Sequence, residues 1–222
     1  MLDVGQPLVE DSQLDSEWNK WFADYLSDHF GKHVSLDLVL NVREAAIRCY
    51  APSIFSYTIW HFVKPDIDHF RKLRGRFDNL DYSKYLVVRP LANEICEALS
   101  EKYTLATAAN QPAVTQQILE DAGILRHFKF KEMSGSMKYS KPDIRFFLYI
   151  LDQIDVKPEE AVMVGDRQDN DIVPARLLGM KTIRWRGGLF KDQEVRMPSE
   201  EPDGNIEKLS ELPDALEKLR QK

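Results

Sequence analysis

The stretch AVMVGDRQDND, residues 161–171, runs from a short apolar segment into a cluster of carboxylates. An apolar run that ends in Gly-Asp and gives way to a helical pattern predicts a strand, a loop and a helix. In open parallel sheets, ligands bind at the carboxyl ends of the strands. Asp166 and Asp171 therefore indicate a site for a hard cation such as Mg²⁺, which prefers oxygen ligands. The alternative is a polar loop with a helix cap, because Asp and Asn are common capping residues.

Polar residues also follow earlier segments of the chain. The motif SKPD, residues 140–143, contains Lys141 and Pro142, and we expect Pro142 to be the first residue of a helix. Thr107 ends a short β-rich run, and Asp3 stands close to the start of the sequence. Each of these sites offers a residue that is able to bind phosphate or a metal ion, and their repetition favours a functional site over a simple loop.

The chain divides into a helical segment and a segment in which strands and helices alternate. The first is rich in aromatic residues at helical spacing, as with Trp18, Trp21 and Phe22, and contains no convincing strand. The alternation that follows predicts an α/β fold with a parallel sheet and right-handed crossovers. Ser35 is expected to cap a helix of the first segment, and Lys181–Trp185 is expected to be a strand of the second. The expected domains are an α/β core, residues 1–13 and 86–222, and a small helical domain, residues 14–85.

On these motifs the chain resembles the haloacid dehalogenase-like hydrolase superfamily, in the branch with a helical cap inserted after the first motif. The resemblance extends over nearly the whole chain and implies a parallel-sheet, Rossmann-like core with an all-helical cap domain. Asp3 corresponds to the first motif and Thr107 to the second. Lys141 corresponds to the third, and Asp166 with Asp171 to the fourth.

The resemblance also implies a mechanism. Asp3 would attack phosphorus and form an aspartyl-phosphate, which is covalent catalysis by a carboxylate. Mg²⁺ would be held by Asp3 and Asp166, with Asp171 completing the site. Thr107 and Lys141 would bind the phosphoryl group, and Lys141 would also balance its developing charge. The expected function is thus a Mg²⁺-dependent phosphatase that acts on a small phosphate monoester.

The first motif departs from the pattern of the resembled family. That family usually carries a second Asp two residues after the nucleophile, where it protonates the leaving group, but here the position holds Gly5. Pro7 replaces a common Thr, and Ala108 replaces a common Asn. Loss of a general acid typically lowers the rate about 10²- to 10⁴-fold, so we expect weakened rather than abolished catalysis. The alternative is a catalytically silent phospholigand-binding or protein-interaction module; a carbon–halogen hydrolase is less favoured because that chemistry needs no metal.

Composition limits the remaining possibilities. The chain has 222 residues, with 30 basic and 36 acidic side chains and a net charge of −6, which disfavours a nucleic-acid surface. No apolar run has the length of a membrane span, and no signal peptide is evident. Cys49 and Cys96 lie in apolar helical patterns and are expected to be small buried residues. These features predict a cytoplasmic protein and leave its oligomeric state open. The small phosphorylated substrate is implied by the resemblance alone.

The position of Asp3 is unusual for a residue that follows a central strand. Met1 and Leu2 precede it in this sequence, whereas strands typically run about 5–6 residues. One hypothesis is that the natural protein has residues upstream of Met1, and the other is that the sheet tolerates a very short central strand.

Overall fold

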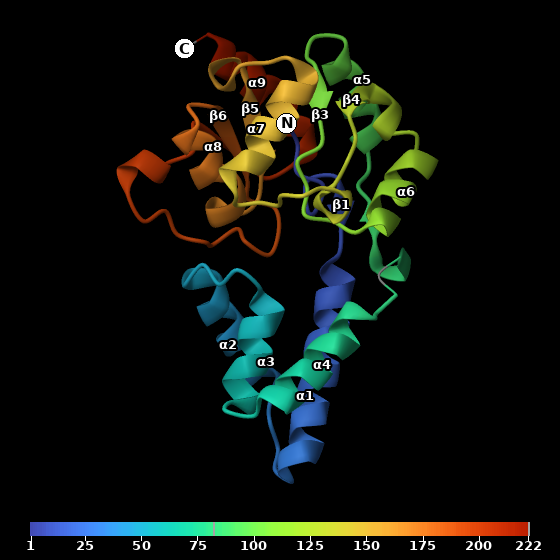
Figure 1. Ribbon diagram of the computed structural model, residues 1–222, viewed down its shortest axis with the longest axis vertical. Coiled ribbons are helices and arrows are strands. Elements are labelled where there is room, and N and C mark those ends of the chain that lie inside the picture. The colour runs from blue at the N-terminus through green and yellow to red at the C-terminus, as the bar shows by residue number, and fades with distance from the viewer. Residues whose placement is uncertain (82, 222) are drawn as a thin grey trace. The chain divides into compact units, whose positions relative to one another are not determined.

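The computed structural model describes residues 1–81 and 83–221. They form two compact units, one from Met1–Asp11 with Leu86–Lys222 and the other from Ser12–Tyr85 (Figure 1). Each unit has a hydrophobic core of its own. No described helix combines the length and apolar character needed to cross a membrane.

The Ser12–Tyr85 unit is built from helices. Ser35 caps the second helix by accepting a hydrogen bond from the Leu38 N–H, as the sequence predicts, and Ser53 and Asp66 cap the next two helices in the same way. Its apolar core includes Trp18, Phe22, Leu26, Ile59 and Leu73. The elements are α1 (Ser12–Phe30), α2 (Leu36–Arg48), α3 (Ile54–Val63), α4 (Ile67–Asp78) and the 3-10 turn η1 (Ser83–Tyr85).

The other unit contains a parallel sheet with a very short central strand. Leu2 forms parallel bridges to Thr107 on one side and Val164 on the other, and so joins two groups of strands. The Leu2 N–H donates to the Ala106 carbonyl at 2.9 Å, and the Asp3 N–H donates to the Val164 carbonyl at 2.8 Å. The resulting order is β4, β3, Leu2, β5, β6, β7. These strands are β3 (Leu105–Ala106), β4 (Phe128–Phe130), β5 (Val162–Gly165), β6 (Lys181–Trp185) and β7 (Gly204–Ile206).

Helices cover both faces of this sheet because successive strand residues point to opposite sides. Val164 packs in one core cluster with α5 (Ala92–Ser100), α6 (Ala113–Asp121) and α9 (Leu212–Arg220). Met163 packs in a second cluster with α7 (Ile144–Ile154) and α8 (Val173–Leu177). The expected α/β fold with a Rossmann-like parallel sheet is thereby confirmed.

Three local features differ from the sequence-based expectations. Helix α7 begins at Ile144 rather than Pro142, because the Asp143 side chain accepts the Arg145 N–H and caps the helix. The expectation that Cys49 is buried is wrong: it is the C-cap of α2 and is exposed. The short antiparallel strands β1 (Val9–Glu10) and β2 (Val87–Val88) were not anticipated, because two residues are too few to show a period.

Candidate active site

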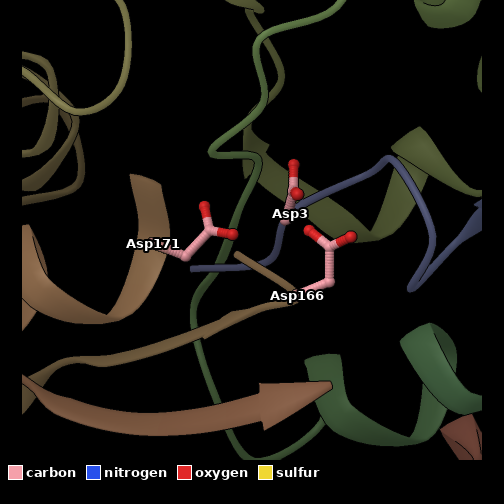
Figure 2. A group of neighbouring side chains, drawn as sticks. All are labelled: Asp3, Asp166 and Asp171. Atoms are coloured by element: carbon pink, nitrogen blue, oxygen red, sulfur yellow. The ribbon is translucent and has the colours of Figure 1, made fainter. Parts of the chain in front are cut away.

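Three carboxylates from two neighbouring strands meet at one edge of the sheet. Asp3 follows the central residue Leu2, and Asp166 directly follows β5. Asp171 lies in the π-helical turn η5 (Gln168–Ile172), which follows β5 as well. Figure 2 shows their carboxylates pointing toward one another, and each offers an oxygen atom within 4.8 Å of the others. All three residues are buried.

The loop after β5 brings Asp171 back toward the strand. A Cβ atom added to Gly165 would lie 2.6 Å from the Asp171 Cβ, so a side chain at position 165 is excluded by the loop. The Arg167 N–H donates to Asp171 Oδ2 at 2.9 Å. Gln193, which lies outside this turn in the sequence, also bonds to it: its Oε1 accepts the Gln168 N–H at 2.6 Å. The turn is therefore held at two points, by the Arg167 N–H bond to Asp171 and by the Gln193 bond to the Gln168 backbone.

Lys141 bridges two of the carboxylates. Its Nζ lies 2.9 Å from Asp3 Oδ1 and 2.5 Å from Asp171 Oδ1, and its side chain is 3% exposed. Asn110 fixes the Lys141 backbone from both sides: the Asn110 amide donates to the Lys141 carbonyl at 2.8 Å, and its Oδ1 accepts the Lys141 N–H at 2.9 Å. Burial alone would lower the pKa of Lys141, but Asp171 and Asp3 outweigh it and raise the pKa to about 12.

The cluster carries more negative than positive charge. Burial, reinforced by Asp3 and Asp171, raises the pKa of Asp166 well above its ordinary value. Burial also raises the pKa of Asp171 to about 6, with Asp3 adding to the shift and Lys141 opposing it. Lys141 supplies one positive charge against three carboxyl groups. Buried oxygen ligands with this excess of negative charge fit a hard divalent cation such as Mg²⁺.

Thr107 lies beside this cluster but its hydroxyl points to the backbone. Thr107 forms a parallel bridge with Leu2, the residue that precedes Asp3. Its hydroxyl donates to the Glu132 carbonyl at 2.8 Å, and the residue has no exposed surface. The structure thus places Thr107 next to the cluster. Its contact with a phosphoryl group stays a prediction.

The turn after Asp3 has an unusual backbone. Gln6 has a φ of 72°, in the left-handed region that favours glycine, and is buried. Its side chain contacts Asp11, and its carbonyl accepts a hydrogen bond from Arg89. Pro7 follows without an N–H to donate. The Leu8 and Val9 N–H groups both bond to the Val4 carbonyl, which closes the turn.

Comparison with known proteins identifies relatives of this fold and site. A family model described as HAD-hydrolase-like matches residues 138–212, which contain Lys141, Asp166 and Asp171. The HAD phosphatase of Thermococcus onnurineus superposes with a TM-score of 0.64 at 25% sequence identity, over 97% of this chain and 95% of that chain. Residues 138–212 thus match the haloacid dehalogenase-like hydrolase family, and the chain as a whole is similar to a structure of that family.

Two further proteins are similar to this chain. Glyceraldehyde 3-phosphate phosphatase of Methanopyrus kandleri is 39% identical over 97 residues, which are 44% of this chain and 42% of that protein. The magnesium-bound HAD-hydrolase YfnB of Bacillus subtilis has a TM-score of 0.65 at 20% identity, over 97% of this chain and 96% of that chain, which shows a common fold. The chain spans less than half of the length of three curated phosphatases that it matches, between 34% and 46%.

The superfamily resemblance inferred from the motifs is thus confirmed, whereas the helical-cap branch stays a prediction. Sequence reasoning missed two residues that position the cluster, Asn110 and Gln193. Asn110 follows Thr107 closely in the sequence, and this proximity to a predicted site residue could have indicated its role. Gln193 lies in an irregular segment far along the chain from the residues it contacts, and no local pattern indicates its role.

Proposed function

We propose that this protein is a Mg²⁺-dependent phosphatase that hydrolyses a small phosphorylated substrate through an aspartyl-phosphate on Asp3. The single observation that carries the proposal is the buried cluster of Asp3, Asp166 and Asp171 with Lys141 bonded to two of its members. The relatives named as phosphatases and the magnesium-bound fold relative support the same reaction class and metal.

Asp3 is suited to act as the nucleophile. Its two observed contacts, from the Val4 N–H at 2.8 Å and from Lys141 Nζ at 2.9 Å, both involve Oδ1. These contacts hold the carboxylate in one orientation, and Oδ2 is proposed as the attacking oxygen. Orientation of this kind lowers the entropic part of the barrier. Displacement at phosphorus would transfer the phosphoryl group to Oδ2, and water would then release phosphate and regenerate the carboxylate.

The remaining residues would bind the metal and balance charge. Asp3, Asp166 and Asp171 would hold Mg²⁺, which when bound reduces the repulsion between an anionic nucleophile and an anionic substrate. Lys141 stays protonated throughout the neutral range, because its pKa is raised to about 12. It would therefore supply a fixed positive charge to the phosphoryl oxygens. The Ser12–Tyr85 unit is proposed as the cap domain that selects the substrate, and Thr107 as a further hydrogen-bond donor to phosphate.

Hydrolysis of p-nitrophenyl phosphate tests this function, because its leaving group needs little protonation. We expect Mg²⁺-dependent turnover that is abolished by a chelator and by Asp3→Asn. The matched control is Asp152→Asn on the exposed side of α7, which makes the same chemical change away from the cluster. Turnover by Asp3→Asn at the level of the unsubstituted protein would refute Asp3 as the nucleophile. No turnover in a folded, Mg²⁺-binding protein would favour the silent binding module.

A further inference from the structure

The side-chain space of residue 5 is filled by another residue. Gly5 lies two positions after Asp3 and has no side chain of its own. A Cβ atom built on Gly5 would lie 2.7 Å from Nε2 of Gln111, closer than real Cβ contacts. The carboxamide of Gln111 therefore occupies the place where a side chain at position 5 would begin.

The orientation of this carboxamide is set by a buried hydroxyl. Thr115, on the first turn of α6, has no exposed surface and donates its hydroxyl hydrogen to Gln111 Oε1 at 3.2 Å. Because Oε1 is the acceptor in this bond, the NH₂ group is the end that faces Gly5. The backbone at Gln111 is also confined, since a Cβ atom on Gly135 would lie 3.1 Å from the Gln111 carbonyl oxygen.

Two observations place this amide beside the carboxylate cluster. Val4 separates Asp3 from Gly5 and is completely buried in a core cluster, so the positions on either side of it face away from that core. Gln111 directly follows Asn110, whose side chain bonds to the backbone of Lys141 at the cluster. The amide donor is thus held at the carboxyl edge of the sheet, on the side of residue 5.

We propose that Gln111 donates a hydrogen bond to the leaving-group oxygen during phosphoryl transfer to Asp3, and that the site consequently selects substrates whose leaving group departs as a stable anion. Such substrates are acyl phosphates, phosphoanhydrides and activated aryl or enol phosphates. The inference rests on the proposed function, since it assumes that Asp3 accepts the phosphoryl group.

The selectivity follows from the chemistry of an amide. An amide N–H stabilises negative charge on the departing oxygen but has no proton to transfer at neutral pH. When the Asp3 Oδ2–P bond forms and the bond from phosphorus to the leaving oxygen breaks, the electron pair stays on that oxygen. Water then attacks phosphorus, the electron pair of the broken Asp3–phosphorus bond returns to the carboxylate, and the proton of water passes to solvent. A donor aimed at developing charge is typically worth about 10²- to 10³-fold in rate.

The test is the dependence of kcat/KM on the leaving group, measured with a series of aryl phosphates. The series runs from p-nitrophenyl phosphate to phenyl phosphate, whose phenol has a pKa of about 10 like that of tyrosine. We expect kcat/KM to fall steeply as the pKa of the leaving phenol rises. This parameter reports the steps up to transfer to Asp3, so slow hydrolysis of the aspartyl-phosphate does not mask the effect.

Two different substitutions should weaken the same hydrogen bond. Gln111→Ala removes the donor, and Gly5→Ala displaces it, because the added methyl group takes the place of the flexible amide end. Both should lower kcat/KM for phenyl phosphate about 10- to 100-fold, and less for p-nitrophenyl phosphate, which steepens the leaving-group dependence. Gln117→Ala, an exposed residue on α6, is the matched control and should leave the slope unchanged. If Gln111 had a purely structural role, its substitution would lower kcat/KM equally for all substrates.

The outcomes separate the inference from the proposed function. A flat leaving-group dependence in an enzyme that is inactivated by Asp3→Asn would show that a proton is delivered, and would overturn the inference alone. An unchanged slope in folded Gln111→Ala and Gly5→Ala variants would overturn it as well. If the protein turns over none of the series above the Asp3→Asn background, the proposed function and this inference fail together.

Discussion

Asp171 lies directly against the α-carbon of Gly165, and the absence of a side chain there allows the carboxylate to reach the cluster. Gly165→Ala would place a methyl group 2.6 Å from the Asp171 Cβ, which is attached to rigid backbone and has no free end that can swing away. We expect Asp171 to be displaced, Mg²⁺ affinity to fall about 10- to 100-fold and stability to fall by about 1–3 kcal/mol. Isothermal titration with Mg²⁺ and thermal unfolding measure the two effects.

The control for this substitution is Gly204→Ala in β7. A Cβ atom there meets its nearest neighbour at 3.8 Å, which is an ordinary contact, and the residue is far in sequence from the cluster. The Gly204→Ala variant should bind Mg²⁺ with the same affinity as the unsubstituted protein. Equal loss of affinity in both variants would mean that general destabilisation, rather than movement of Asp171, explains the result.

Asn110 acts at the same scale through two hydrogen bonds to the backbone of Lys141. Asn110→Ala leaves the Lys141 N–H and carbonyl without these partners, and a lost hydrogen bond to a buried group costs about 1–3 kcal/mol. We expect lower stability and, because Lys141 is less well fixed, a kcat reduced about tenfold with little change in KM. Steady-state kinetics on p-nitrophenyl phosphate check this, with exposed Asn205→Ala in β7 as the control. A changed KM at constant kcat would contradict a positioning role.

At the scale of elements, periodicity and turn chemistry correctly predicted the strands and helix caps that depend on local sequence. The strand Lys181–Trp185 and the Ser35 cap were found as expected, because a buried β-branched run and a capping hydroxyl are local signals. The π-helical turn η5 and the clamp by Gln193 were not predictable. They depend on contacts between segments that are distant in sequence, and local propensity carries no information about such contacts.

The central strand position of the sheet is short, and Leu2 bridges both of its neighbours there. A cavity of about 540 Å³ lies at the amino-terminal side of the sheet, lined by Met1, Leu2, Leu105 and Val162 among others. The Met1 ammonium is buried, donates to the Val162 carbonyl at 2.8 Å, and has its pKa lowered by burial to about 5. The cavity thus continues the line of the short central strand between β3 and β5.

An extension of Val and Ile residues before Met1 should lengthen that strand and raise the melting temperature. It also moves the amine out of the sheet. Because the folded pKa of this amine is below its ordinary value of 8.0, the stability it contributes is present above pH 8 and is lost as the pH falls toward 5. The gain from the extension should therefore be larger at pH 6 than at pH 9. A Gly-Ser extension of equal length is the control, and an equal gain from it would contradict strand formation.

At the scale of the whole molecule, the sequence predicted which residues lie close together better than it predicted the contacts that they make. The motifs placed Asp3, Lys141, Asp166 and Asp171 in one cluster, because the carboxyl ends of neighbouring parallel strands meet at one edge. The occupation of the residue 5 space by Gln111 was not visible in the sequence, since it results from how the loop after β3 packs against the turn after Asp3.

Metal binding should stabilise the folded molecule in a pH-dependent way. The folded pKa of Asp171, about 6, is raised above its ordinary value of 3.8, so the stability it contributes is present below pH 3.8 and is lost as the pH rises through 6. At pH 7.5 the metal-free protein therefore holds carboxylates that repel one another, and Mg²⁺ relieves this repulsion. At pH 5 protons compete with Mg²⁺ for the same oxygens. We expect Mg²⁺ to raise the melting temperature by several degrees at pH 7.5, because saturation at 100 times Kd is worth about 2.7 kcal/mol, and by clearly less at pH 5.

Calorimetric melting with MgCl₂ against NaCl of equal ionic strength separates specific binding from salt screening, which acts mainly on exposed charges. Asp166→Asn removes one proposed ligand and should abolish the difference between the two salts at pH 7.5. It should also stabilise the metal-free protein at that pH, because burial and the two neighbouring carboxylates disfavour the charge that it removes. A Mg²⁺ effect of the same size at both pH values, or one that survives Asp166→Asn, would place the binding site elsewhere on this acidic chain.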